Sequence, residues 1–186
     1  MNKYNTADNT VEFRSTPITG TELLLGCGNN QEKQLALPEK EKWADKVTLD
    51  IDPDTEPNVL WDLHHLPLPF DDETFEEIHA YDVLEHVGQQ GDWKTFFAQF
   101  DEIYRILKPG GHFFAITPAW DSLWAWSDPG HSRIISEGTI HFLNQDSYKN
   151  TGKTNMTDYR HIYKSDFEIV HSRDENERFC FVLRKK

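Results

Sequence analysis

The chain contains few cysteines and no long hydrophobic stretch. Its 186 residues include two cysteines, Cys27 and Cys180, which are too few for a disulfide framework and indicate a reducing compartment. No apolar run reaches the length of a membrane-spanning helix, and the first residues lack the hydrophobic segment of a signal peptide. We therefore expect a soluble, cytoplasmic protein with no membrane partner.

Basic residues are also scarce. Lysine and arginine number 19 against 32 aspartates and glutamates, which gives a formal net charge of -13. Phosphate groups repel an acidic surface, and no basic cluster precedes the last three residues. We therefore expect no nucleic-acid partner.

The remaining composition is that of a folded domain. Hydrophobic residues make up 37% of the chain and aromatic residues 13%, so one domain of this length can bury a sizeable core. The first twenty residues are polar and rich in asparagine, threonine and aspartate. These features predict a flexible arm over residues 1–20 and a single domain over residues 21–186.

The chain is organised around a short apolar run that ends in a glycine turn. Residues 23–25 are three leucines, which is typical of a buried central strand, and Gly26 and Gly28 follow directly. Glycines allow a tight turn whose backbone N–H groups face a nucleotide-like ligand. Such turns are also common in ordinary loops, so this stretch alone leaves both interpretations open.

Three later strands are each expected to end at a carboxylate. In an open parallel sheet, ligands bind at the carboxyl ends of the strands, so acids repeated at this edge indicate a binding site. The predicted strands cover residues 46–49, 58–61 and 75–81, and they are followed by Asp50, Asp62 and Asp82.

The connections between these strands lack the pattern of long helices. Residues 31–42 are charged and contain Pro38, which disfavours a regular helix because proline removes a hydrogen bond and clashes with the preceding turn. A short helix is expected over residues 83–87.

One long amphipathic helix is predicted over residues 93–107. Its apolar side chains recur at helical spacing, Asp92 can cap its start, and the Lys-Pro-Gly-Gly sequence of residues 108–111 ends it. A fifth buried strand follows over residues 113–116.

The last third of the chain divides into a loop-rich segment and a hairpin. Residues 119–165 hold many tryptophans, tyrosines and histidines with poor periodicity, and we expect them to bind and cover a substrate. Strand-like runs over residues 167–172 and 178–183 then predict an antiparallel hairpin.

Five stretches in this order resemble the class I S-adenosylmethionine-dependent methyltransferases, and most closely the small-molecule branch known as the type 11 group. They are LLLGCG (residues 23–28), VTLDID (47–52), WDLHHLPLPFDDETFEEI (61–78), YDVLEHV (81–87) and EIYRILKPGGHFFAITP (102–118). The resemblance implies an α/β fold with a Rossmann-like, doubly wound, seven-stranded sheet whose last strand is antiparallel. It also implies S-adenosyl-L-methionine as cofactor and a small-molecule or other non-nucleic-acid methyl acceptor.

The resemblance assigns cofactor contacts by position. The glycine turn would pack on the methionine part, the acid after the second strand would hold the ribose hydroxyls, and the residue after it would pack on adenine. The next acid would contact the adenine amino group, and backbone at two further positions would lie beside the cofactor. The residues are Gly26, Cys27, Gly28, Asp50, Ile51, Asp62, Leu63 and Tyr81.

Two departures from the family pattern leave an alternative open. Leu24 stands where the family often has an acid, and Asn30 stands where a third glycine is frequent. One alternative is therefore a catalytically inactive, methyltransferase-like protein that binds the cofactor or serves as a partner subunit. A second alternative is a nicotinamide-dependent oxidoreductase.

Candidate catalytic residues lie in the sequence Ser-Asp-Pro-Gly-His at residues 127–131. It resembles a stretch found after the fifth strand in some family members, and it makes His131 and Asp128 candidates for a general base or a substrate contact. His131 serving only to order the loop is the alternative. No metal site is expected, because the adjacent pair His64 and His65 lacks a clear third ligand.

Overall fold

The computed structural model describes residues 4–5, 10–11 and 20–186 of the chain. Strands β1 (Tyr4–Asn5) and β2 (Thr10–Val11) pair with each other in an antiparallel manner. The rest of the flexible arm expected over residues 1–20, apart from Gly20, lies outside the described residues.

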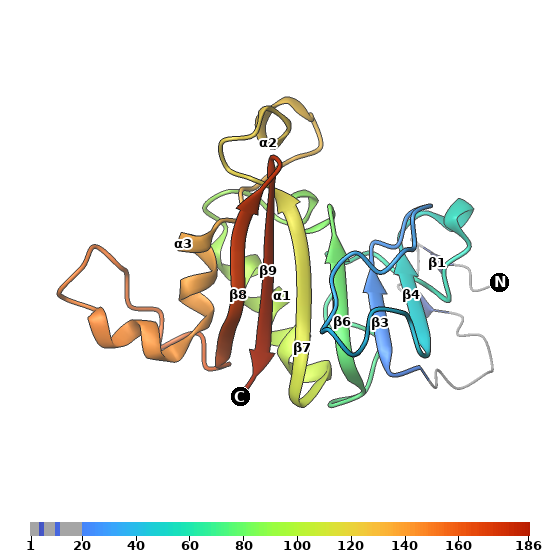
Figure 1. Cartoon of the computed structure of the whole chain (residues 1–186), viewed down its shortest axis with the longest axis horizontal. Coiled ribbons are helices and arrows are strands. Elements are labelled where there is room, and N and C mark those ends of the chain that lie inside the picture. Colours follow the sequence, from blue (N-terminus) through green and yellow to red (C-terminus); the bar gives the residue numbers. More distant parts are fainter. Residues whose placement is uncertain (1–3, 6–9, 12–19) are drawn as a thin grey trace.

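A seven-stranded sheet forms the centre of the molecule (Figure 1). Its strand order is β5-β4-β3-β6-β7-β9-β8, with parallel pairing from β5 to β7 and antiparallel pairing of β9 with both neighbours. The predicted sheet with an antiparallel last strand is therefore confirmed. The strands are β3 (Glu22–Leu25), β4 (Lys46–Asp50), β5 (Val59–Leu60), β6 (Phe75–Tyr81), β7 (Leu107–Pro118), β8 (Phe167–Glu175) and β9 (Arg178–Lys185).

The helices are mostly short. Only α1 exceeds three turns among the described residues, and none is long and apolar enough to cross a bilayer there. The α-helices are α1 (Trp93–Ile106), α2 (Leu123–Ser127) and α3 (Glu137–Ile140), and the 3₁₀ helices are η1 (Pro53–Thr55), η2 (Leu84–His86), η3 (His141–Leu143) and η4 (Gln145–Asn150).

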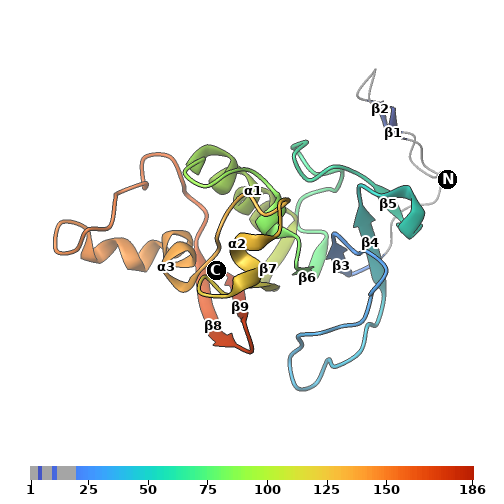
Figure 2. The same ribbon diagram turned by 90° about the horizontal axis from the view of Figure 1, so that it is seen from above.

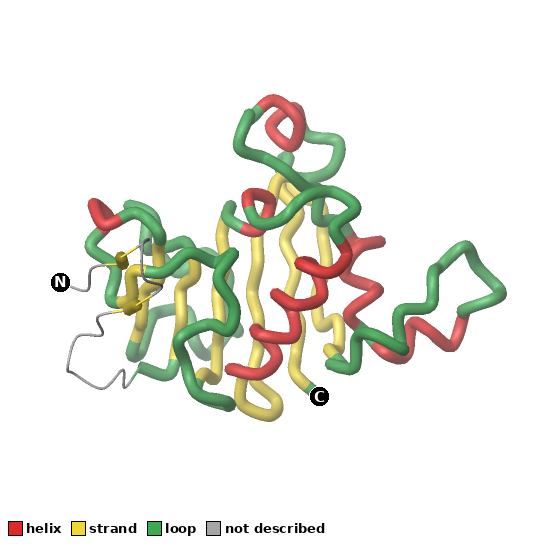
Figure 3. The backbone as a smooth tube through the Cα atoms, turned by 180° about the vertical axis from the view of Figure 1, so that it is seen from behind, coloured by secondary structure: helices red, strands yellow, loops and turns green. Residues whose placement is uncertain are grey.

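Helix α1 covers one face of the sheet (Figure 3). Its start is capped as expected, because the Asp92 carboxylate accepts a hydrogen bond from the Thr95 N–H at 3.2 Å. Its buried stripe includes Phe100 and Ile103, which belong to the same apolar cluster as Leu23 and Phe113 of the sheet. The predicted amphipathic helix is therefore confirmed, and it contributes to the main core.

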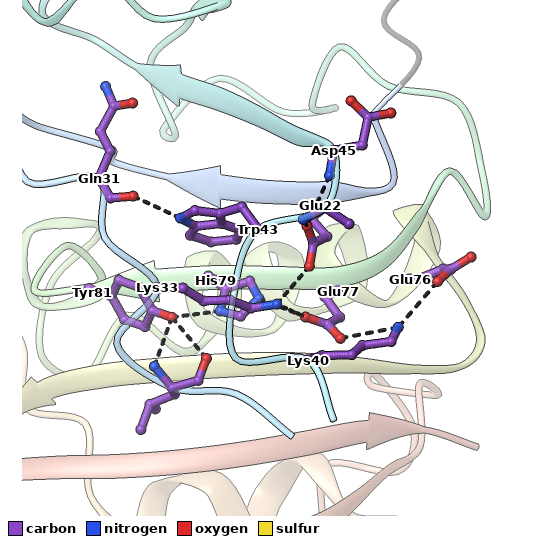
Figure 4. Close-up of polar contacts among 12 residues, drawn as sticks. Glu22, Gln31, Lys33, Lys40, Trp43, Asp45, Glu76, Glu77, His79 and Tyr81 are labelled. Carbon is purple, nitrogen blue, oxygen red and sulfur yellow. Dashed lines mark hydrogen bonds and ion pairs between the residues drawn. The ribbon is translucent and has the colours of Figure 1, made fainter. Parts of the chain in front are cut away.

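The opposite face carries no regular helix between β3 and β4 (Figure 2). Residues 27–45 cross this face as irregular chain, in agreement with the effect expected from Pro38. Ionic and aromatic contacts hold the segment in place instead. The buried Lys33 ammonium lies 2.6 Å from both Glu22 and Glu77, and Trp43 packs edge-on against His79 (Figure 4).

The segment over residues 119–165 splits into two parts. Helix α2 stands at the edge where β6 and β7 end (Figure 1). From α3 onward the chain instead packs on the α1 face, where Ile140 and Leu143 join the main core and Tyr163 stacks on Phe97. Only the first part therefore reaches the edge at which the parallel strands end.

Candidate functional site

A cavity of about 340 Å³ lies at the carboxyl ends of β3, β4 and β5. We call it the Asp50 cavity. Its lining includes Gly26, Asp50, Ile51, Asp62 and Leu63. Parallel strands end at one edge of the sheet, so residues from four separate loops meet there.

The glycine turn closes one side of this cavity. Gly26 and Gly28 both have positive φ angles, of 58° and 48°. A Cβ on Gly26 would lie 2.4 Å from Val83 Cγ2, whereas a Cβ on Gly28 would meet no atom within 4 Å. Gly26 therefore allows close packing of two loops, while Gly28 leaves open space beside the turn.

The Asp50 carboxylate is held by backbone on both sides. Its Oδ2 accepts a hydrogen bond from the Gly28 N–H at 2.8 Å, and its Oδ1 accepts one from the Asp52 N–H at 2.9 Å. A carboxylate offers about four acceptor positions. Asp50 can therefore accept two further hydrogen bonds, which is what a ribose with two hydroxyls requires.

Next to Asp50, the cavity wall has an apolar and an acidic component. Ile51 is 63% exposed although it is a large aliphatic residue, so it offers a surface for a flat ring. Burial raises the pKa of Asp62, but hydrogen bonds from the His64 N–H and imidazole outweigh it and hold that pKa below its usual range. Asp62 is therefore an anionic acceptor.

Five of the eight positions that the resemblance assigns to the cofactor line this cavity. Gly28 contributes through its bond to Asp50. The Cys27 side chain is buried in a cluster with Leu24 and Tyr81, on the face of the sheet that residues 27–45 cover. The Tyr81 hydroxyl bonds to His79 and Leu35 there, so the side chains of Cys27 and Tyr81 lie outside the cavity.

A second cavity of about 480 Å³ adjoins the first. We call it the Glu85 cavity. Both candidate catalytic residues, His131 and Asp128, line it, together with Glu85. Asp82 and His86 line both cavities, so two ligands bound in them would be neighbours.

Glu85 is the most unusual side chain in this second cavity. It is 2% exposed, and neither carboxylate oxygen has a hydrogen-bond partner among the described residues. Burial raises the pKa of Glu85 to about 8. Unpaired buried carboxyl groups are rare in native proteins outside functional sites.

The two histidines lie against Glu85 and against each other. His131 Nε2 is 3.9 Å from Glu85 Oε1 and 3.9 Å from Asp128 Oδ2, which is too long for a hydrogen bond. The Nδ1 of His131 is buried without a partner among the described residues. The rings of His86 and His131 meet edge to face at 4.6 Å between centroids.

Glu85 and Arg178 are the residues that the sequence did not reveal. Arg178 enters from β9 and pairs with Asp82. Glu85 stands in the Leu-Glu-His-Val stretch, but its backbone carbonyl bonds to the N–H groups of residues 132 and 133, far along the chain. The one sequence signal that could have pointed to Glu85 is the Leu-Glu-His-Val stretch itself, because it matches the family pattern.

Comparison with known proteins supports the same assignment. Residues 23–115, which make up half of the chain, match the family model of a methyltransferase domain. No curated protein matches the chain. Similar solved structures include a SAM-dependent methyltransferase from Archaeoglobus fulgidus, with 16% identity over 90% of this chain and 88% of that one at a TM-score of 0.56.

Two further structures show the same fold. One is a chain from the complex that contains the Haloferax volcanii Trm112 methyltransferase activator, with 14% identity, coverage of 92% and 84%, and a TM-score of 0.59. The other is the N-methyltransferase NodS from Bradyrhizobium japonicum WM9 in complex with S-adenosyl-L-homocysteine, with 12% identity, coverage of 88% and 76%, and a TM-score of 0.52.

The Asp50 cavity fits S-adenosylmethionine on the chain's own features. Asp50 has free acceptor positions for the ribose hydroxyls, and the exposed Ile51 side chain offers a surface for the adenine ring. The open space beside Gly28, where another residue would have its Cβ, leaves room for ligand atoms. The chain belongs to the methyltransferase-domain family and is an S-adenosylmethionine-dependent methyltransferase.

Proposed function

We propose that the acceptor is a small molecule bound in the Glu85 cavity. The observation that carries this proposal is the shared wall of the two cavities, formed by Asp82 and His86. Methyl transfer needs the nucleophile aligned close to the donor, and neighbouring cavities provide that proximity. The acidic net charge of -13 disfavours nucleic acid in the same place.

The rim of the Glu85 cavity supports an acceptor with a flat or apolar part. Trp124 of α2 lines the cavity and is 61% exposed, and its neighbours Trp120 and Trp126 are also exposed. Large exposed aromatics next to a cavity are a common feature of binding surfaces. The cavity volume of about 480 Å³ is in the range of small-molecule sites.

The chain's residues divide between the donor and the acceptor. Asp50, Ile51 and Asp62 would hold the nucleoside part of S-adenosylmethionine, which supplies a methyl group already activated on sulfur. His131 and Asp128 would contact the acceptor or assist the removal of its proton.

Transfer of labelled methyl groups tests the proposal. The full chain is incubated with methyl-labelled S-adenosylmethionine and with small-molecule, protein or nucleic-acid fractions, and label is expected in the small-molecule fraction. His131→Asn should lower turnover by about 100-fold while S-adenosylhomocysteine affinity stays unchanged. His171→Asn, at an exposed histidine on β8, is the control and should retain full turnover. Label in nucleic acid or protein alone, or in no fraction although the cofactor binds, would reject the proposal.

Cofactor binding can be tested separately at Asp50. Asp50→Ala should weaken S-adenosylhomocysteine binding by about 1.5–3 kcal/mol, because hydrogen bonds from the ribose to a charged group are lost. Asp54→Ala, on the exposed 3₁₀ helix η1, is the control in the same calorimetric titration. Equal affinity of parent and Asp50→Ala would remove Asp50 from the cofactor site.

A further inference from the structure

The Glu85 cavity contains a group of metal-ligand side chains that are not adjacent in the sequence. Glu85, His86 and His131 each place one ligand atom within 4.8 Å of the others. We propose that these three residues bind one divalent transition-metal ion, and that the ion binds a hydroxyl group of the methyl acceptor. The second half of this proposal rests on the proposed function.

Unsatisfied polar atoms provide the first argument. Both Glu85 oxygens and His131 Nδ1 are buried without hydrogen-bond partners among the described residues, and the two side chains are 3% and 9% exposed. Leaving such groups unpaired costs about 1–3 kcal/mol each, and more for a charged group. An ion bound between the carboxylate and the imidazoles would satisfy the Glu85 oxygens.

The backbone around the cluster is fixed, which is the second argument. The Glu85 carbonyl accepts hydrogen bonds from the N–H groups of Ser132 and Arg133, at 2.9 and 3.2 Å, so the two ligand-bearing loops are joined. His86 Nδ1 donates to the Gly130 carbonyl at 3.1 Å. That bond selects the tautomer in which His86 Nε2 keeps its lone pair, as in histidines that bind metals.

Local charge provides the third argument. Besides Glu85, the cavity is lined by three exposed carboxylates and a single guanidinium, namely Asp82, Asp128 and Glu177 against Arg178. Arg178 is engaged by Asp82. A cation therefore enters a site in which negative groups outnumber positive ones.

The ligand types indicate which ions bind. One carboxylate with two imidazoles is a set used for zinc and for other first-row transition metals, whereas Mg²⁺ prefers oxygen ligands only. Ligand atoms around such an ion at about 2.1 Å are roughly 3–3.5 Å apart. The cluster therefore has to contract by about 1 Å when an ion binds.

An ion in this place would act on the acceptor. Three protein ligands would leave coordination positions open, and an ion that lowers the pKa of bound water to about 7 would also acidify an acceptor hydroxyl bound there. The O–H bond would break with its electron pair left on oxygen, and the proton would pass to solvent water at the rim, where the Asp128 side chain is 44% exposed. The acceptor atom is then oxygen, and His131 is a metal ligand rather than the base.

Direct metal binding tests the site without any assay of activity. The full chain is treated with a chelator, dialysed and titrated calorimetrically with Zn²⁺, Mn²⁺ and Mg²⁺ in separate experiments. We expect one Zn²⁺ or Mn²⁺ ion per chain and no comparable binding of Mg²⁺. Glu85→Gln and His131→Asn should each weaken binding at least tenfold, whereas His171→Asn should match the parent.

Each protein is also titrated with S-adenosylhomocysteine. Unchanged affinity in Glu85→Gln shows that the variant is folded, and His86→Asn provides a third ligand variant should Glu85→Gln fail to fold. Equal metal binding by parent and all ligand variants would overturn the site. Full methyl transfer to the small-molecule fraction by chelator-treated protein would overturn the role of the ion. Label in protein or nucleic acid alone would count against the proposed function and leave the metal site standing.

Discussion

Gly26 and Gly28 have similar backbone angles but different surroundings, so the same substitution should have different effects. Alanine at either position has to adopt a positive φ, which costs about 1–2 kcal/mol. At Gly26 the new Cβ also lies 2.4 Å from Val83 Cγ2. We expect Gly26→Ala to lower the free energy of unfolding by about 1–3 kcal/mol more than Gly28→Ala, measured by urea denaturation.

Relief of the clash provides the control for this prediction. In the double variant Gly26→Ala/Val83→Ala, the substitutions should be non-additive, because removal of the Val83 methyl groups makes room for the new Cβ. Equal losses in Gly26→Ala and Gly28→Ala would show that the turn tolerates the contact.

At the level of single residues, the sequence predicted which acids follow a strand, but it did not predict which acid is buried in the cavity. The sequence located Asp50 and Asp62 because each follows a run of strand residues, and both line the Asp50 cavity. Glu85 and His131 are 46 positions apart, and they meet where the backbone of residues 132 and 133 bonds to the Glu85 carbonyl. No local pattern encodes that contact.

Among the elements, the irregular segment over residues 27–45 depends on one lysine. The Lys33 side chain is 1% exposed and pairs with the buried carboxylates of Glu22 and Glu77. We expect Lys33→Met to lower the free energy of unfolding by about 3–5 kcal/mol, because it leaves buried Glu22 without its cation and leaves buried Glu77 with only the partly exposed Lys40. Denaturant unfolding measures this loss.

Lys40 provides a matched comparison on the same segment. Its side chain is 42% exposed, and it lies 3.3 Å from Glu76 and from Glu77. Solvent screens such pairs, so Lys40→Met should change the free energy of unfolding by less than about 1 kcal/mol. Losses of similar size in the two variants would show that burial of the Lys33 pairs is unimportant.

The predicted elements agree with the structure where periodicity is strong. The helix over residues 93–107 and the strand over residues 75–81 follow from repeated apolar side chains. Pro38 correctly excluded a long helix after β3, but the sequence did not indicate what covers that face. The answer lies in ionic pairs between residues 11 and 44 positions apart, which no short-range pattern records.

At the scale of the whole molecule, two buried groups, His79 and Glu77, should each contribute a loss of stability in acid, in separate pH ranges. Burial holds the pKa of His79 below its ordinary value of 6.5. Burial opposes ionisation of Glu77, but hydrogen bonds from His79 and Lys33 outweigh it and lower the pKa of Glu77 to about 2. Both groups bind protons more weakly in the folded state, so their contributions to stability are present at high pH and lost on acidification.

His79 governs the upper of these ranges. Its ring is buried among Glu77, Tyr81, Lys33 and Phe114, donating from Nε2 to Glu77 and accepting at Nδ1 from the Tyr81 hydroxyl, as a neutral imidazole does. Below pH 6.5 the unfolded chain takes up a proton that the folded chain excludes. The free energy of unfolding then falls with decreasing pH by up to about 1.4 kcal/mol per unit for this one group.

The variant His79→Gln keeps a polar side chain but cannot titrate. We measure the unfolding free energy of both proteins by urea denaturation at several pH values. Between pH 6.5 and 5, that of the variant should fall less steeply with decreasing pH than that of the parent, by up to about 1.4 kcal/mol per pH unit. Burial shifts the pKa of Glu85 in the opposite direction, but Glu85 is present in both proteins, so the difference between the two curves isolates His79. Below pH 4.5 both proteins should lose stability together, because the unfolded chain then binds a proton at Glu77 while the folded chain keeps this carboxylate ionised down to about pH 2. Parallel curves from pH 6.5 to 5 would mean that His79 accepts its proton in the folded state, and the buried cluster beneath residues 27–45 would then carry one more positive charge at mildly acidic pH.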